Sequence, residues 1–282
     1  MTTGSNNKVR RAFADTSIGQ MHYRYAGQGP VLLLLHASPG SSKQLEGLIT
    51  QLSGRFRVIA PDTPGNGDSP PLTLEKPTIA DYSALILELL DALEIATVCV
   101  YGSHTGACLA SELALLAPDR VERVIQDGAV VFTAEERVDM LEKYAHPFAP
   151  DLEGTHLLRA FIFCRDQFVF FPWYARDKEH LRDTGFPDPG SLHDWVLEVL
   201  KGATTYHLAY RAAFAYLSEE RLPLVRQPVL CIAAADDPLG PGTRELAERM
   251  DNASFTPLPR YDDPLYLDSL SDAIEGFAGT TD

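Results

Sequence analysis

Short apolar runs that alternate with helix-like stretches restrict the fold of this 282-residue sequence more than any other feature. The runs are rich in Val, Ile and Leu, which is typical of parallel strands covered on both faces. They occupy residues 31–35, 57–60, 97–101, 121–125 and 229–233. Because strands that alternate with helices form right-handed crossovers, we expect a doubly wound, mostly parallel α/β sheet. Function is expected at the carboxyl ends of its strands.

Two further segments have clear patterns of their own. Residues 10–15 and 21–25 alternate in polarity around the turn residues Ser17 and Gly19. This alternation predicts a β-hairpin with one solvated face. In residues 79–93 the apolar side chains recur at spacings of three and four, which predicts an amphipathic helix with Thr78 as its N-cap.

The strand–helix alternation stops between about residues 133 and 222 and resumes at Pro228. The segment between them has helical patterns interrupted by prolines. A helical insertion into a single α/β domain explains this arrangement. We therefore expect a core made of residues 1–132 and 223–282, and a cap, residues 133–222, that lies over the functional site.

The acidic composition limits the partners that this chain can have. Its 24 Lys and Arg residues against 39 Asp and Glu residues give a formal net charge of −15. Proteins that bind nucleic acid need basic residues to displace phosphate counterions, so no nucleic-acid partner is expected. No purely apolar run, such as residues 31–35, approaches the ~20 residues of a membrane helix, so no membrane span is expected either.

The cysteines give no indication of a metal site or of disulfide bonds. All four lie in apolar segments without Cys-x-x-Cys spacing: Cys99, Cys108, Cys164 and Cys231. This pattern is typical of buried free thiols in a reducing compartment. Residues 1–11 are polar and lack the apolar stretch of a secretory signal. We therefore expect a cytoplasmic protein without a metal or another cofactor.

Three of the predicted strand ends carry short motifs. They read Leu-His-Ala-Ser-Pro-Gly at 35–40, Pro-Asp-Thr-Pro-Gly-Asn-Gly-Asp-Ser at 61–69 and Val-Tyr-Gly-Ser-His-Thr-Gly-Ala at 100–107. In this order, after a hairpin and before a helical insertion, they resemble the α/β-hydrolase family over nearly the whole chain. The resemblance implies the α/β-hydrolase fold and a strained strand-to-helix turn, the nucleophile elbow, of the form Gly-x-nucleophile-x-Gly.

The resemblance places His104 in the nucleophile position, where the family carries Ser, Cys or Asp. Gly102 and Gly106 are then the small residues that the tight turn needs. A frame shifted by one residue would make Ser103 the nucleophile, but its neighbours would be Tyr101 and Thr105, which are too bulky for this turn. His104 as a mere space-filler is also disfavoured, because two ring nitrogens need partners that an aliphatic side chain would not.

The same resemblance indicates which carboxylates accompany His104. The family's acid normally follows the penultimate strand, which maps it to Asp237. Asp127 stands at a second place where the family carries an acid, and it has an alternative reading as a turn residue. The family's catalytic histidine follows the last strand, but no histidine occurs after His207 in this sequence. Its position falls on Asp263, with Asp262 as a one-residue alternative.

Two backbone N–H groups complete the site that the resemblance implies. They belong to Thr105, after the elbow residue, and to Ser38, in the turn after the first parallel strand, and they form an oxyanion hole. His36, in the same turn, is assigned no chemistry. A carboxylate bound to one nitrogen of His104 would fix its tautomer and leave the other nitrogen as a base or nucleophile.

The predicted cap is rich in aromatic residues between positions 161 and 174. Most of them are expected to pack the cap against the core. A cap over an active site must also line the pocket, and we expect Phe163, Phe168 and Trp173 to face the substrate, with Arg165 or Asp166 as a polar anchor. The sequence therefore predicts a small, largely apolar or aromatic organic substrate.

These observations favour a hydrolase that uses a His–carboxylate site and an oxyanion hole in place of a Ser-His-Asp triad. Two alternatives remain at this point. One is lyase-type proton abstraction on the same scaffold, and the other is a non-catalytic ligand-binding protein, since fold alone does not determine function.

Overall fold

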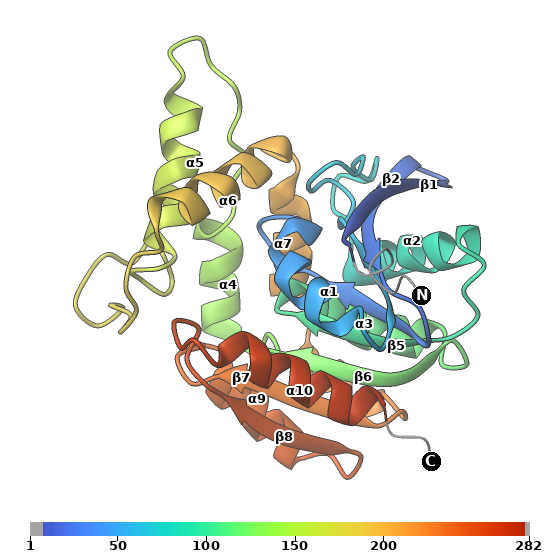
Figure 1. The fold of residues 1–282 in the computed structure, drawn as a ribbon. Helices are drawn as coiled ribbons and strands as arrows, with labels where there is room; N and C mark the ends of the chain where they lie inside the picture. Colours follow the sequence, from blue (N-terminus) through green and yellow to red (C-terminus); the bar gives the residue numbers. More distant parts are fainter. Residues whose placement is uncertain (1–7, 280–282) are drawn as a thin grey trace.

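Eight strands form a single sheet that is parallel except at one edge (Figure 1). The computed structural model describes residues 8–279, so most of the polar segment 1–11 lies outside the described residues. The strand order is β1-β2-β4-β3-β5-β6-β7-β8. The strands are β1 Arg10–Thr16, β2 Gly19–Ala26, β3 Val31–Leu35, β4 Arg57–Pro61, β5 Val98–Ser103, β6 Val121–Asp127, β7 Val229–Ala234 and β8 Ala253–Leu258.

The pairing confirms the predicted sheet. β1 pairs with β2 as an antiparallel hairpin, and β2 pairs antiparallel with β4. Every pair from β4 to β8 is parallel. The chain is therefore an α/β protein with a doubly wound, mostly parallel sheet, as the alternation of strands and helices predicts.

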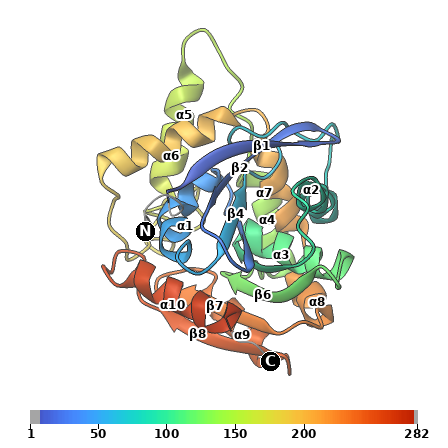
Figure 2. The same ribbon diagram turned by 45° about the vertical axis from the view of Figure 1, so that its right-hand side comes forward.

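Helices cover both faces of the sheet (Figures 1 and 2). Side chains on β3 alternate between two apolar clusters, because successive residues of a strand point to opposite faces. Leu32 and Leu34 pack with α1, Glu46–Leu52, and α10, Tyr266–Ala278. Leu33 and Leu35 belong to the cluster on the other face. The helices of that face are α2 Ile79–Ala92, α3 Thr105–Leu116 and α9 Gly240–Glu248.

The predicted helix at residues 79–93 is α2. The side chain of Thr78 accepts a hydrogen bond from the Asp81 N–H, and Asp81 accepts one from the Thr78 N–H in return. This capping box satisfies backbone donors that a helix start leaves free.

Between β6 and β7 the described chain contributes no strand to the sheet. Phe170 and Leu181 form only an isolated bridge. The helices of this interval are α4 Ala134–Lys143, α5 Thr155–Asp166, α6 Pro189–Lys201, α7 Tyr206–Ala215 and α8 Ser218–Arg221. A short 3₁₀ helix, Leu222–Leu224, follows, and another, Ser42–Leu45, precedes α1.

The interval 133–222 does not lie entirely above the core. α5 and α6 stand away from the sheet in Figures 1 and 2, and they share an apolar cluster with α4. On α7, Ala209, Ala212 and Ala213 instead join the cluster of α2 and α3. Their small side chains allow α7 to approach those helices closely. No helix of the described residues is long and apolar enough to span a bilayer.

Candidate active site

The turn between β5 and α3 has the geometry of a strained elbow. His104 lies in this turn with φ 49° and ψ −105°, and its N–H donates to the carbonyl oxygen of Asp127 over 2.8 Å. A Cβ on Gly102 would lie 2.0 Å from the carbonyl oxygen of Gly106, and one on Gly106 would lie 2.1 Å from that of Leu35. Only glycine fits at both positions, which is the steric requirement the sequence predicts around His104.

His104 contacts the carboxylate of Asp237, which follows β7. Its Nε2 lies 2.8 Å from Oδ2 of Asp237. The other ring nitrogen, Nδ1, has no hydrogen-bond partner among residues 8–279. Asp237 is held from two more directions, because its Oδ1 accepts from the Leu239 N–H and its Oδ2 accepts from the Tyr261 hydroxyl, both over 2.8 Å. An ionised Asp237 would therefore fix His104 with its proton on Nε2.

The two groups shift each other's protonation. Burial lowers the pKa of His104, but the charge and hydrogen bond of Asp237, helped by the charge of Asp127, raise it above its usual value. Burial raises the pKa of Asp237, yet the charge and hydrogen bond of His104 and the bonds from Leu239 and Tyr261 lower it to about 2. Asp237 is thus ionised at neutral pH.

Asp127, at the end of β6, contacts a different partner. Its Oδ2 accepts a 2.6 Å hydrogen bond from the Tyr101 hydroxyl, and its Oδ1 is buried without a partner in the described structure. Burial raises the pKa of this carboxyl to about 6, although the Tyr101 hydrogen bond and the charge of His104 lower it. The sequence left Asp237 and Asp127 as alternative partners of His104. In the structure Asp237 contacts His104, whereas Asp127 accepts a hydrogen bond from Tyr101.

Asp263 does not face His104, so that expectation is wrong. Its side chain is exposed and accepts a hydrogen bond from the Leu265 N–H at the start of α10. Asp262 borders the cavity described below but pairs with Arg260. The side chain that reaches Asp237 from this loop is Tyr261. The loop turns at Asp263 to begin α10, which carries Asp263 outward.

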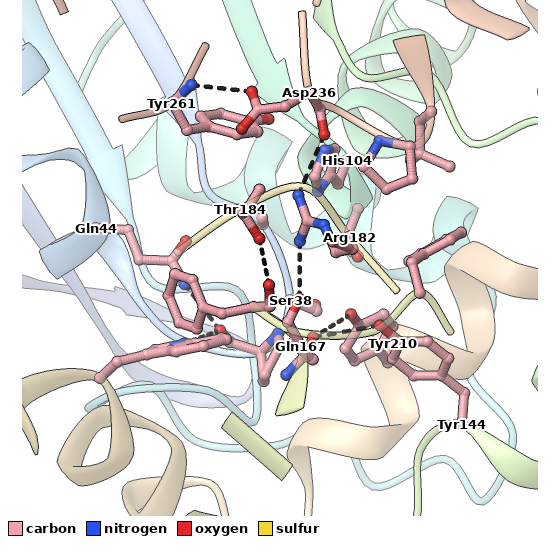
Figure 3. Close-up of a pocket in the computed structure, with 18 of the residues that line it drawn as sticks. Ser38, Gln44, His104, Tyr144, Gln167, Arg182, Thr184, Tyr210, Asp236 and Tyr261 are labelled. Carbon is pink, nitrogen blue, oxygen red and sulfur yellow. Dashed lines mark hydrogen bonds between the residues drawn. The ribbon is translucent and has the colours of Figure 1, made fainter. Parts of the chain in front are cut away.

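His104 lines a cavity of about 640 Å³, a size suited to a small organic ligand (Figure 3). Its walls are largely apolar and aromatic. The main apolar contributions come from Val130, Phe132, Phe168, Phe171, Trp195 and Phe214. Figure 3 shows a polar group at each end, with Tyr261, Asp236 and His104 at one and Gln167, Tyr210 and Tyr144 at the other.

Two backbone donors border the same cavity. Thr105 is the first residue of α3, and Ser38 follows β3. Neither N–H has an acceptor within the part of the chain that the structure describes. The N-terminus of α3 adds a partial positive charge at this point. The site can therefore stabilise negative charge that develops on a substrate oxygen.

Of the residues in the interval 133–222 that we expected to bind substrate, only Phe168 lines the cavity. Phe163 is buried in the apolar cluster that α4, α5 and α6 share, and Trp173 packs against it and donates to the Tyr144 carbonyl oxygen. Arg165 pairs with the buried Asp166. The register of α5 turns Phe163 towards α4 and α7, so it cannot face the cavity. Phe168, by contrast, lies just beyond the end of α5 and borders the cavity.

Sequence reasoning found His104, Ser38 and Thr105 but missed several other residues that add polar groups to the cavity. They are Tyr144, Gln167, Arg182, Tyr210, Asp236 and Tyr261. They come from separate parts of the interval 133–222 and from the loops after β7 and β8, so no local motif brings them together. Only Tyr261 could have been found from the sequence, because it lies in the loop where the resemblance places a catalytic side chain.

His22 on β2 lies close to Asp62 and Asp68 in the turn after β4, at distances that could suit a metal ion. These groups already have partners. His22 Nδ1 lies 2.8 Å from Asp62, Asp62 also accepts from the N–H and hydroxyl of Ser42, and Asp68 pairs with Arg11. They organise the turn itself. His36 is similarly satisfied, since Nε2 accepts from the Thr63 N–H and Nδ1 contacts the Ala37 carbonyl oxygen.

Comparisons with known proteins agree with this geometry. A family model described as "alpha/beta hydrolase fold" matches residues 30–255. An uncharacterized protein of Mycobacterium bovis is 36% identical over 107 residues, which are 36% of this chain and 30% of that protein. A Caulobacter protein provisionally named carbamate hydrolase RutD is 27% identical over 248 residues, or 80% of this chain and 85% of the relative.

Solved structures share the fold over nearly the full length. The enol-lactonase from Burkholderia xenovorans superposes with a TM-score of 0.72 at 22% identity, and the match covers 95% of this chain and 100% of the other. At this identity the likeness shows the fold alone. By contrast, the aligned part of the Mycobacterium relative is less than a third of its length.

Proposed function

Because the chain belongs to the α/β-hydrolase fold family, we propose that it is a hydrolase in which His104 acts as a general base on water. The observation that carries this proposal is the position of one imidazole. Its Nε2 is bound to an ionised Asp237, and its Nδ1 has no hydrogen-bond partner among the described residues. The ring borders a cavity that also receives two backbone N–H groups without an acceptor in residues 8–279. Base, orienting carboxylate and oxyanion donors thus converge on one space.

The proposed reaction is hydrolysis of an ester or lactone. Nδ1 of His104 takes a proton from water as the water oxygen attacks the carbonyl carbon. The negative charge moves to the carbonyl oxygen, where the N–H groups of Thr105 and Ser38 stabilise it. The tetrahedral intermediate then expels its alkoxide, which receives the proton from the imidazolium. Asp237 keeps its charge throughout and stabilises the imidazolium.

Water activation is favoured over an acyl-imidazole. An acyl group on Nδ1 would leave a cationic ring unless Nε2 lost its proton, and Asp237, with a pKa of about 2, is a poor acceptor for that proton. The relative named carbamate hydrolase supports a carbonyl compound as substrate. The apolar walls of the cavity support a small, largely aromatic molecule.

Two broader assignments accompany this proposal. Residues 133–222 serve as a cap that closes the cavity, since Tyr144, Phe168 and Trp195 line it from three different segments of that interval. The protein works in the cytoplasm, because its four cysteines are buried free thiols rather than disulfides.

The test is the hydrolysis of three 4-nitrophenyl esters, those of acetic, butyric and phenylacetic acid, by the purified protein and by His104→Gln. We expect the rate to fall by about 10²–10⁴ in the variant, the scale of general-base catalysis. His193→Ala, which removes an exposed imidazole on α6, is the matched control for background hydrolysis by surface histidines. Equal rates in wild type and His104→Gln would refute the proposal.

Two further measurements separate the alternatives. Hydroxylamine should trap no acyl-enzyme, whereas a trapped acyl group on His104 would replace water activation by nucleophilic catalysis. Serine-directed fluorophosphonates should not label the protein, and labelling that disappears in Ser103→Ala would return the site to an ordinary esterase. Ligand binding without turnover of any ester would favour a lyase or a non-catalytic binding protein.

A further inference from the structure

Arg182 brings a positive charge to the wall of the proposed active site. Its backbone N–H donates to the Val169 carbonyl oxygen, which fixes this part of the cap loop. Figure 3 shows its guanidinium between His104 and Gln167. One terminal nitrogen donates to the carbonyl oxygen of Gln167 over 2.7 Å, and the other donates to that of Asp236 over 3.3 Å. Both acceptors are neutral, so neither compensates the charge.

The acidic side chains of the cavity wall are paired with another arginine. Asp262 lies 3.1 Å from Nε of Arg260, and Asp236 lies 3.9 Å from a terminal nitrogen of the same residue. Arg182 has no carboxylate within ion-pair distance among the described residues. Its guanidinium carries five N–H donors, of which two are used. Partly buried cations normally have a counter-charge, and here a ligand would have to supply it.

The surroundings of Arg182 also define the rest of the ligand. The hydroxyls of Tyr144 and Tyr210 both donate to Oε1 of Gln167, over 3.3 and 3.2 Å, and make a polar surface beside the guanidinium. Phe168 and Trp195 pack edge to face across the same cavity and offer an apolar surface. An anion at Arg182 would therefore be attached to an apolar or aromatic body.

We infer that Arg182 binds a carboxylate of the substrate, so that the substrate class is small aromatic or apolar acids. This inference rests on the proposed function for the reacting bond, an ester or lactone held near His104. A planar guanidinium suits a planar carboxylate, which it can bind through two parallel N–H···O contacts. A chain with a net charge of −15 does not attract anions at long range, so the selection must come from this local contact.

The experiment compares two probes of nearly the same shape, phenylacetate and phenylacetamide, at pH 7.5. Binding is followed by tryptophan fluorescence, because Trp195 borders the cavity, and by ligand-observed NMR. We expect the wild type to bind the acid at least about tenfold more tightly than the amide, the scale of a charge-assisted hydrogen bond. Arg182→Met should abolish this preference, and Arg182→Lys should retain part of it.

Arg159→Met is the matched control, since Arg159 is an exposed arginine of α5 that does not line the cavity. It should bind both probes as the wild type does. Equal binding of acid and amide by the wild type would overturn the inference. A preference for the acid that survives in Arg182→Met but disappears in His104→Gln would assign the anion to His104 and also overturn it.

The test is independent of turnover. If Arg182 selects the acid but no ester is hydrolysed, the proposed function fails and the binding site remains. If esters are hydrolysed but acid and amide bind equally, only the inference about Arg182 fails. Arg182→Lys keeps the positive charge, and its ammonium group can still reach the carbonyl oxygens of Gln167 and Asp236. This variant therefore also shows whether a loss of binding in Arg182→Met reflects a displaced loop.

Discussion

The hydroxyl of Tyr261 lies 2.8 Å from Oδ2 of Asp237, the same oxygen that Nε2 of His104 contacts. Two donors thus share one acceptor. The carboxylate is also almost fully buried, with 4% of the residue exposed. The hydrogen bond from Tyr261 compensates part of the negative charge of Asp237, which would otherwise act on His104 alone. Tyr261 therefore influences the pKa of the imidazole through Asp237.

Tyr261→Phe should raise the pKa of His104. Without the hydroxyl, the charge of Asp237 acts more strongly on the imidazolium, because a carboxylate is a stronger acceptor when it has fewer donors. The rising limb of the pH–rate profile should therefore move to higher pH, by about half a unit if a fraction of one charge-assisted hydrogen bond is transmitted. An NMR titration of His104 checks the shift independently of activity. A downward shift would contradict this role for Tyr261.

The sheet was predictable because its signals are local. The strands β3, β5 and β7 are each buried on both faces, so their sequences are nearly unbroken apolar runs. The elbow was predictable for a similar reason, because Gly102 and Gly106 are required by contacts made within a few residues and with the neighbouring strand.

The polar groups of the cavity could not be predicted in this way. Tyr261 and Asp263 are two residues apart in an irregular loop, and only the path of the backbone into α10 determines which of them reaches Asp237. Arg182 lies in the loop between α5 and α6, whose position depends on tertiary contacts with Gln167 and Asp236. Side-chain direction in such loops has no periodicity that a sequence can display.

Gly128→Ala should displace the imidazole and remove activity. Gly128 has φ +69°, and a Cβ there would lie 2.3 Å from Cδ2 of His104 and 2.8 Å from Oδ2 of Asp237. The strained backbone and the close contact should also reduce the free energy of unfolding by about 1–3 kcal/mol. Thermal denaturation and ester hydrolysis measure the two effects.

The control is Gly276→Ala, in α10. A Cβ on Gly276 would have no neighbour within 4 Å among the described residues, and alanine should stabilise the helix by about 0.5–1 kcal/mol. This variant should keep full activity. Wild-type activity in Gly128→Ala would show that the imidazole position is not restricted by residue 128.

Asp127→Asn should become more stable relative to the wild type as the pH rises. The pKa of Asp127 is about 6 in the folded state and near 3.8 when exposed, so the folded state binds more protons than the unfolded state between these values. Unfolding free energy of the wild type therefore falls with rising pH in this window. The amide cannot ionise but still accepts from Tyr101. The difference between the two proteins should grow by about 2 kcal/mol from pH 4 to 6.5.

Urea denaturation at several pH values measures this difference. The comparison across pH removes any constant cost of placing an amide where Oδ1 of Asp127 has no partner within residues 8–279. A difference that stays constant from pH 4 to 6.5 would mean that Asp127 titrates at its ordinary value.

Asp237→Asn and Asp263→Asn form a matched pair that tests which carboxylate serves His104. Asp237 raises the pKa of His104 through its charge and its hydrogen bond, so the amide should let that pKa fall towards the lower value that burial alone imposes. A general base must be unprotonated, so activity rises with pH through this pKa. The rising limb should start above ~6.5 in the wild type and move to lower pH in Asp237→Asn.

The maximal rate of Asp237→Asn should fall by about 10²–10⁴. The reason is the tautomer, because an amide N–H directed at Nε2 would place the ring proton on Nδ1, the nitrogen that must accept a proton from water. Asp263→Asn should leave both the rate and the pKa unchanged, since Asp263 is exposed and its amide can still accept from the Leu265 N–H. A His104 titration that is identical in Asp237→Asn and the wild type would rule out the pair, and a loss of rate in Asp263→Asn would reinstate the carboxylate that the structure places outside the cavity.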